Sequence, residues 1–256
     1  MKIAVLIKQV PGAESPLQIS SDQKWVDESA VAYVMNESDN YALEEALQIK
    51  EAHGEGEVVA VSLGPDRVQK TVREALAKGA DRAIHIKMDT VEVIDPLVTA
   101  GHFNNPLKEE NFDLIFTGLQ SDDLGMGQTG VILGEMLGMA TASLVMATEV
   151  SAGNIKVKRE LEAGWFQWVS LSLPASITIQ SGLNTPRYPS LKGIMGAKKK
   201  EIRVISASEH QSATRAQAID QVFLPQTTKK TEVIEGNADT VAARIVEILK
   251  YDVKVL

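Results

Sequence analysis

Apolar runs of strand length alternate with segments of helical spacing in the first half of the chain. The four runs are residues 2–8, 57–64, 83–87 and 112–118. The segments between them carry apolar residues three and four positions apart, as amphipathic helices do, and they span residues 39–54, 67–80 and 95–103. Strands that alternate with helices predict an α/β fold, in which a mostly parallel, doubly wound sheet is covered on both faces.

Polar and small residues mark the ends of these predicted helices. Gly54 and Gly79 follow the last apolar positions of the first two, where glycine commonly ends a helix. Asp95 and Pro96 are suited to the cap and first turn of the third. For the first helix the sequence leaves three capping residues open, which are Asn36, Ser38 and Asn40.

The pattern changes after Met139 to closely spaced strand candidates at 142–150, 154–161, 166–173 and 176–180. Short turn sequences separate them, which favours antiparallel strands added at the edge of the sheet. Residues 206–235 are polar and lack a clear period, and residues 237–250 then predict one last amphipathic helix. Its inner side carries Val241, Ile245, Ile248 and Leu249. We therefore expect an α/β domain at 1–205, followed by a C-terminal arm and helix at 206–256 that dock on a partner.

The turn after the fourth strand, GLQSDDLGMGQTG at residues 118–130, is rich in glycine. At the carboxyl end of a parallel strand, glycines let the backbone approach a ligand and let its N–H groups point at a phosphate. A flexible loop that merely caps the next helix is an equal alternative, because the turn matches neither common phosphate-loop spacing. The strand ends at 35–40 and 61–67 fall on the same predicted edge, which favours a mononucleotide site there.

Composition narrows the classes of function. The chain has no cysteine, which excludes disulfides, thiol nucleophiles and thiolate metal sites. A net charge of −8 argues against nucleic acid as a partner. No apolar run reaches the roughly 18 residues of a membrane-spanning helix, so we expect no membrane insertion and a cytoplasmic protein.

Known catalytic patterns are missing from the sequence. The four histidines have no metal-ligand spacing, and structural or exposed roles are expected for His53, His85, His102 and His210. Asp122 and Asp123 could hold a metal or act as a base, but a turn-forming role is favoured.

A second surface is indicated between residues 187 and 196. This predicted loop places Tyr188, Leu191, Ile194 and Met195 close together, which is more apolar surface than a free loop needs. It precedes the basic run 198–200, and it is interpreted as a contact surface.

Several segments of the chain follow one another in a specific order. They are KIAVLIKQV, MNESDNYALEEALQIKE, VSLGPDRVQKTVREALAKGADRA, GLQSDDLGMGQTG, VKRELEAG and LPASITIQSGLNTPRYPSLKGIMGAKKK. Together they resemble the small (beta) subunit of electron transfer flavoproteins, and the resemblance covers almost the whole chain. Each piece alone is weakly diagnostic, but their order and spacing together are specific.

The resemblance implies a non-catalytic subunit that pairs with an alpha subunit and shuttles electrons from flavin dehydrogenases to an acceptor. It further implies that FAD is held mainly by the alpha subunit, that this chain binds AMP, and that Leu191 in the 187–196 loop docks the dehydrogenase. The AMP contacts implied are Leu6, Asn36, Glu37, Ser38, Asp39, Leu63, Asp113, Gly118, Gln120, Asp123, Gly125, Met126, Gly127, Gln128 and Thr129.

The same resemblance separates AMP from a second flavin. Members with a second FAD carry a turn like DGDTAQVGP, whereas this chain has DDLGMGQTG with Thr129 in place of the valine, which favours AMP. Two other hypotheses about function remain. One is a stand-alone adenine-nucleotide hydrolase or stress-type protein, and the other is an AMP-sensing module. The sequence does not support the hydrolase hypothesis, because no lysine- or serine-bearing phosphate loop is present.

Overall fold

The structure is a computed structural model that describes residues 1–89, 95–209, 214–225, 231 and 233–255. It divides into two compact units, Met1–Gln221 and Val222–Leu256. Residues 214–221 belong to the first unit, and within them the backbone N–H groups of Ala216 and Gln217 donate to Asp95 Oδ2 at 2.6 and 3.0 Å. None of the helices in the described ranges is long and apolar enough to cross a membrane.

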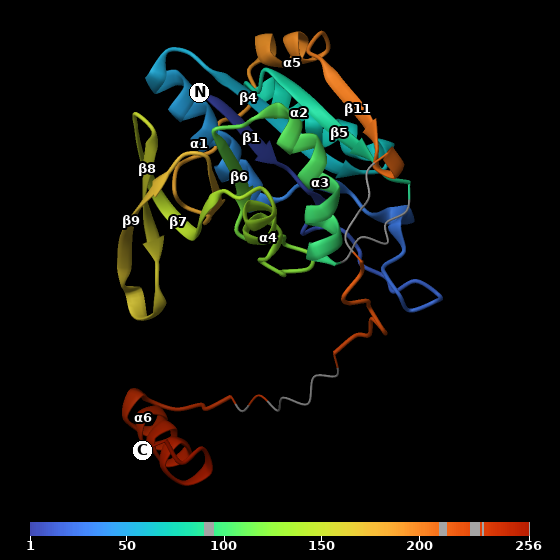
Figure 1. Cartoon of the computed structure of the whole chain (residues 1–256). Helices are drawn as coiled ribbons and strands as arrows, with labels where there is room; N and C mark the ends of the chain where they lie inside the picture. Colours follow the sequence, from blue (N-terminus) through green and yellow to red (C-terminus); the bar gives the residue numbers. More distant parts are fainter. Residues whose placement is uncertain (90–94, 210–213, 226–230, 232, 256) are drawn as a thin grey trace. The chain divides into compact units, whose positions relative to one another are not determined.

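Figure 1 colours the chain along its sequence and labels most of its helices and strands. The strands are β1 (Lys2–Leu6), β2 (Gln9–Pro11), β3 (Tyr33–Met35), β4 (Glu57–Gly64), β5 (Arg82–Lys87), β6 (Leu114–Gly118), β7 (Ala140–Ser151), β8 (Asn154–Glu160), β9 (Phe166–Ser172), β10 (Ala175–Ile179) and β11 (Ile202–Ser206). The α-helices are α1 (Glu37–His53), α2 (Gln69–Lys78), α3 (Pro96–Glu110), α4 (Thr129–Met136), α5 (Leu191–Ala197) and α6 (Ala238–Glu247).

Within the described residues, nine strands form one sheet in the order β11-β5-β4-β1-β6-β10-β7-β8-β9. All pairs from β11 to β7 are parallel, and β7, β8 and β9 pair antiparallel. The predicted mostly parallel sheet with antiparallel additions is therefore confirmed. The chain leaves β1 on one side to form β4 and β5, and returns on the other side as β6. This reversal of strand order beside β1 is the point where doubly wound sheets open a crevice at the carboxyl ends of their strands.

Alternate residues of each central strand supply two separate cores, because successive side chains of a strand point to opposite faces. Ile3 and Val5 of β1 face the core that α1 and α2 cover. Ala4 and Leu6 face the core that α3 and α4 cover. Both faces of the sheet are therefore covered, as the continuous apolar runs predicted.

Two strands differ from expectation. β10, expected among the antiparallel additions, is parallel to both β6 and β7. β11 was not expected at all, and it pairs parallel with β5 at the edge of the sheet away from the β8–β9 hairpin (Figure 1). Both strands find their partners across large distances in sequence, which a local apolar pattern does not encode.

The helices also refine the predictions. The segment expected as a loop at 187–196 contains α5, capped by Ser190, whose Oγ accepts the Gly193 N–H at 3.0 Å. The final helix begins as expected, with Asn237 as its N-cap, and after α6 it continues as a π-helical turn at Ile248–Asp252. No described residue of α6 is buried within its own unit, and Ile245 is 44% exposed.

Glycines let α4 lie close to the sheet. A Cβ atom on Gly134 would stand 2.6 Å from Thr141 Oγ1 and 2.7 Å from the Cβ of Ser176, which are closer approaches than real Cβ atoms show. A Cβ atom on Gly130, one turn earlier, would stand 2.9 Å from Thr178 Cγ2. The spacing of these glycines therefore fixes the distance between α4 and the strands β7 and β10.

We expect Gly134→Ala to lower the free energy of unfolding by about 1–3 kcal/mol, because the added methyl group must displace Thr141 or Ser176. Urea unfolding followed by circular dichroism measures the change. Gly196→Ala is the matched control, since no atom lies within 4 Å of a Cβ at that helical position. Equal unfolding midpoints for Gly134→Ala and the wild type would show that the helix does not depend on this close contact.

Candidate functional site

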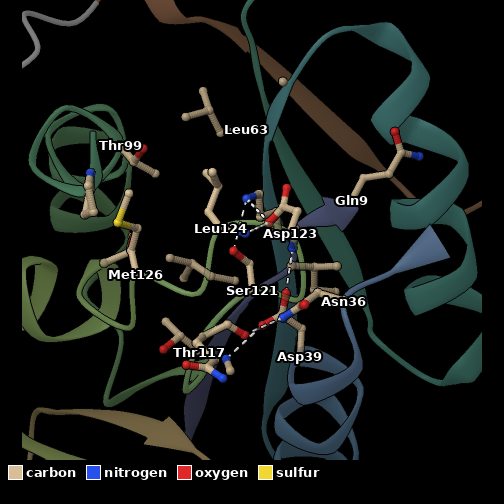
Figure 2. A pocket seen from close by; sticks show the side chains of 18 of the residues that line it. Gln9, Asn36, Asp39, Leu63, Thr99, Thr117, Ser121, Asp123, Leu124 and Met126 are labelled. Carbon is tan, nitrogen blue, oxygen red and sulfur yellow. Dashed lines mark hydrogen bonds and ion pairs between the residues drawn. The ribbon is translucent and has the colours of Figure 1, made fainter. Parts of the chain in front are cut away.

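A cavity of about 210 Å³ lies at the carboxyl ends of β1, β4 and β6. Eleven of the fifteen residues expected to bind a nucleotide line it, and Figure 2 shows several of them. They are Leu6, Asn36, Asp39, Leu63, Gly118, Gln120, Asp123, Met126, Gly127, Gln128 and Thr129. The strand ends that the sequence placed on one edge of the sheet therefore do meet there.

Asp39, in the first turn of α1, joins the strand ends around the cavity. Its buried carboxylate accepts the Lys8 N–H at 2.7 Å and the Gly118 N–H at 2.8 Å. Burial raises the pKa of Asp39 to about 7, against the effect of the two backbone N–H bonds. Gly118 permits this contact because any Cβ there would overlap the Ser38 hydroxyl and the Asp39 carboxylate.

Asn36 joins the start of α1 to the glycine-rich turn. It occupies the N-cap position, yet its side chain caps no helical N–H. Instead its Nδ2 donates to Gln120 O at 2.9 Å, and its Oδ1 accepts the Asp122 N–H at 2.9 Å. The Ser38 hydroxyl also donates to Gln120 O, at 2.8 Å, and Asp122 accepts the Glu37 N–H at 3.1 Å. Glu37 and Ser38 thus support the turn from outside the cavity lining.

Asp123 is paired with a lysine at the cavity wall. Lys8 Nζ lies 2.6 Å from Asp123 Oδ1 and 3.1 Å from Ser121 Oγ, and Figure 2 shows Ser121 and Asp123 together at the cavity wall. The same carboxylate accepts the Leu124 N–H at 2.8 Å. Among the residues that the structure describes, no cluster of three His, Cys, Asp or Glu could hold a metal. Asp122 and Asp123 therefore stabilise the turn.

The far end of the turn presents polar groups without protein partners. Gly125 and Gly127 have φ angles of 61° and 64°, in the left-handed region that favours glycine. α4 begins at Thr129, and its N-cap residue, Gln128, makes no side-chain capping bond. The buried Thr117 Oγ1 at the end of β6 has no hydrogen-bond partner among the described residues. An anion or polar ligand at the start of α4 would satisfy these groups.

The rest of the cavity wall is largely apolar. Leu63 from β4, Phe103 from α3, and Leu124 and Met126 from the turn line this part, and Figure 2 shows Leu63, Leu124 and Met126 around the open space. A polar end beside an apolar wall suits a flat, mostly apolar ring that carries a charged group.

Sequence reasoning missed one part of the lining, which comes from β2, β3 and the segment between them. Arg67 stacks on the Tyr33 ring, with 3.8 Å from its Cζ to the ring centroid, and donates to Gln9 Oε1 at 2.7 Å. Glu28 Oε1 lies 3.2 Å from the same guanidinium. Residues 12–32 have no apolar period that could have signalled this contribution, and the short β2–β3 pair is set by contacts between distant residues.

Besides Glu37 and Ser38, two more of the expected contacts do not line the cavity. Asp113 stands at the amino end of β6, where its Oδ2 accepts the Lys2 N–H at 2.7 Å. The cavity lies at the carboxyl ends of the strands, so Asp113 is at the opposite end of β6 from it. Gly125 belongs to the turn but does not line the cavity.

His85 is buried in β5 with Nε2 at 2.8 Å from Gly64 O, consistent with a structural role, and His210 lies outside the described residues.

The second predicted surface, on α5 and just before it, is exposed. Tyr188, three residues before α5, is 94% exposed and Leu191 76% exposed, and Ile194 and Met195 are also exposed. We call these four side chains the apolar face of α5. α5 and the residues before it lie on the α1 and α2 side of the sheet.

Comparison with known proteins gives consistent results. Residues 23–210 match the model of the electron transfer flavoprotein domain family. An electron transfer flavoprotein subunit beta from Methylophilus methylotrophus is 38% identical over 97% of this chain and 98% of its own length. The subunit beta from Bacillus subtilis strain 168 is 31% identical over the whole of both chains. That of Bradyrhizobium diazoefficiens is 39% identical over 79% of this chain and 80% of its own.

These matches run through the segments that form the cavity and α5. The family model covers most of the chain, and two of the relatives align from end to end or nearly so. The chain therefore belongs to the family of electron transfer flavoprotein beta subunits.

Proposed function

We propose that this chain is one half of a heterodimer that collects electrons from a flavin dehydrogenase and passes them to an acceptor. The relatives are named as subunits, which supports pairing with an alpha subunit. The observation that carries the proposal is the apolar face of α5. Exposure of these side chains to water is unfavourable, and they are suited to an apolar pocket on a donor.

The cavity is proposed to hold AMP. The start of α4 and Thr117 Oγ1 suit the phosphate, and the apolar wall around Leu63 and Leu124 suits the adenine. The AMP serves assembly of the complex, because the carboxylates that line the cavity already have protein partners. Asp39 accepts two backbone N–H groups, Asp123 pairs with Lys8, and Glu28 pairs with Arg67. The redox FAD belongs mainly to the alpha subunit, so this chain has no catalytic residue of its own.

The unit Val222–Leu256 is proposed to dock on the alpha subunit. α6 buries none of its described side chains within its own unit, and Ile245 and Val246 remain exposed. Covering them in the complex would be favourable by roughly 25 cal/mol per Å² of apolar surface.

The rival activity, hydrolysis of ATP by a stand-alone chain, is less well supported. Such an enzyme needs cations for the β- and γ-phosphates. The two cations that line the cavity already have protein partners, since Lys8 is paired with Asp123, and Arg67 lies against Glu28 and Gln9.

Leu124→Trp is expected to fill the cavity and reduce the AMP that co-purifies with the two-chain complex to less than about one tenth of the wild-type amount. Chromatography of the acid-denatured complex measures the nucleotide. Leu17→Trp, at a leucine that is exposed and does not line the cavity, is the control. A Leu124→Trp complex that retains one AMP per beta chain would place the nucleotide elsewhere.

Leu191→Ala in the complex is expected to raise the KM of the donor dehydrogenase for the flavoprotein about tenfold or more, because an apolar anchor commonly contributes on the order of 2 kcal/mol to binding. The melting temperature and flavin content should barely change, since the side chain is exposed. Steady-state assays with varied flavoprotein measure the effect, and Leu17→Ala is the matched control. If Leu191→Ala instead melts the complex while the folded fraction is reduced at the normal rate, the residue is a structural one.

A further inference from the structure

The helix that carries the apolar face is too short to be stable alone. α5 has seven residues, and isolated helices of that length are strongly disfavoured in water. Ala197 is the one α5 residue that is buried in the described structure. The position of α5 must therefore be set by contacts made by its backbone and by the residues that flank it.

Arg187 fixes the chain before α5 to α1. Its backbone N–H and its Nε donate to Glu44 Oε2 at 3.1 and 2.8 Å, and its Nη2 donates to Glu44 Oε1 at 3.0 Å. The same guanidinium reaches Glu51 at 2.6 and 3.0 Å. Asn184, three residues earlier, donates to Tyr41 O at 3.0 Å. One planar side chain thus spans two carboxylates that lie two turns apart on α1, which lysine cannot reproduce.

The electrostatics agree with this geometry. Although burial alone raises the pKa of Glu44, the bonds from Arg187 hold it below its usual range. Bonds from Arg187 likewise lower the pKa of Glu51, and the two carboxylates raise the pKa of Arg187. Both carboxylates are therefore ionised near neutral pH, and all three groups are charged. We call Arg187 with Glu44 and Glu51 the first clamp of α5.

A second clamp holds the chain after α5 to α2. Arg73 Nη1 donates to Ala197 O at 2.6 Å and to Lys200 O at 2.9 Å. In return, Lys200 Nζ donates to Leu76 O at 2.9 Å and to Ala80 O at 2.5 Å, at the end of α2. Between the two clamps, Gly193 touches α2 so closely that a Cβ there would overlap Ala77 O. α5 is thus fixed at both ends and in the middle.

We propose that Arg187 is a positioning residue for donor recognition, which holds α5 so that Leu191 is presented in the place and orientation that the donor pocket requires. The inference rests on the proposed function, because it assigns a role to Arg187 through the docking of Leu191. A recognition helix that is already ordered loses less conformational entropy on binding than a free loop does. The contribution of Leu191 to docking therefore depends on Arg187.

A double-mutant cycle in the two-chain complex tests this dependence, with Arg187→Gln, Leu191→Ala and the pair. We expect Arg187→Gln alone to raise the KM for the flavoprotein about tenfold while kcat at saturation is unchanged. In the double variant the KM should rise little above that of Leu191→Ala, because without Leu191 the position of α5 no longer contributes to docking. Arg82→Gln is the matched control, since Arg82 also pairs with two glutamates, Glu57 and Glu110, but does not touch α5.

The outcomes separate the inference from the proposed function. If Leu191→Ala raises the KM but Arg187→Gln lowers only the melting temperature, as Arg82→Gln should, Arg187 is structural and the inference is wrong. If the two KM effects multiply in the double variant, Arg187 acts independently of Leu191 and the inference is also wrong. If Leu191→Ala itself leaves the KM unchanged, the proposed docking role of α5 fails.

A matched pair of glycines on α5 gives a second test that changes no charge and remains available if Arg187→Gln does not fold. Gly193→Ala should push α5 away from Ala77 O and raise the KM, whereas Gly196→Ala, with nothing within 4 Å of its Cβ, should leave it near the wild-type value. An unchanged KM for a folded Gly193→Ala complex would show that the position of α5 does not matter for docking.

Discussion

The buried carboxylate of Asp39 is the contact on which the rest of the site depends. It joins the end of β1, the start of α1 and the end of β6 through two backbone N–H groups, at 2.7 and 2.8 Å. Those three segments form the polar floor of the cavity, and only glycine at position 118 leaves room for them to meet. An asparagine at position 39 would place an NH₂ group against one of the two N–H donors, and a buried N–H without an acceptor costs about 1–3 kcal/mol. The shape of the cavity is therefore set by backbone geometry around one acidic side chain.

Helix α1 also connects this cavity to the proposed recognition surface. Its first turn carries Asp39, and its later turns carry Glu44 and Glu51, which hold Arg187. The same helix packs on the sheet through Leu43 and Leu47, so both functional regions rest on one rigid element. A nucleotide that stabilises the cavity would thereby help to stabilise α1, the helix to which Arg187 ties the chain before α5. This arrangement supports the proposal that one chain serves both assembly and recognition.

Sequence reasoning was most successful where the chemistry is local. Continuous apolar runs identified β1, β4, β5 and β6, and glycine marked the ends of α1 and α2, because these signals depend on residues close together in sequence. The common edge of those strands then located the cavity. Contacts between distant segments were beyond the pattern. Examples are the parallel pairing of β10 with β6, that of β11 with β5, and the contribution of Glu28 and Tyr33 to the cavity wall. Asp113 was expected in the site only because the family resemblance implied the stretch 113–129. The length of β6 separates Asp113 from the cavity, since Asp113 lies at the amino end of this strand and the cavity at its carboxyl end.

The central claim is that the cavity at the strand ends holds AMP in a two-chain flavoprotein. The most direct measurement is mass spectrometry of the nucleotides released when the purified complex of this chain with its alpha subunit is denatured. The account predicts a yellow complex that releases one AMP and one FAD for each beta chain. Release of two FAD without AMP, or purification of a colourless single chain, would contradict it.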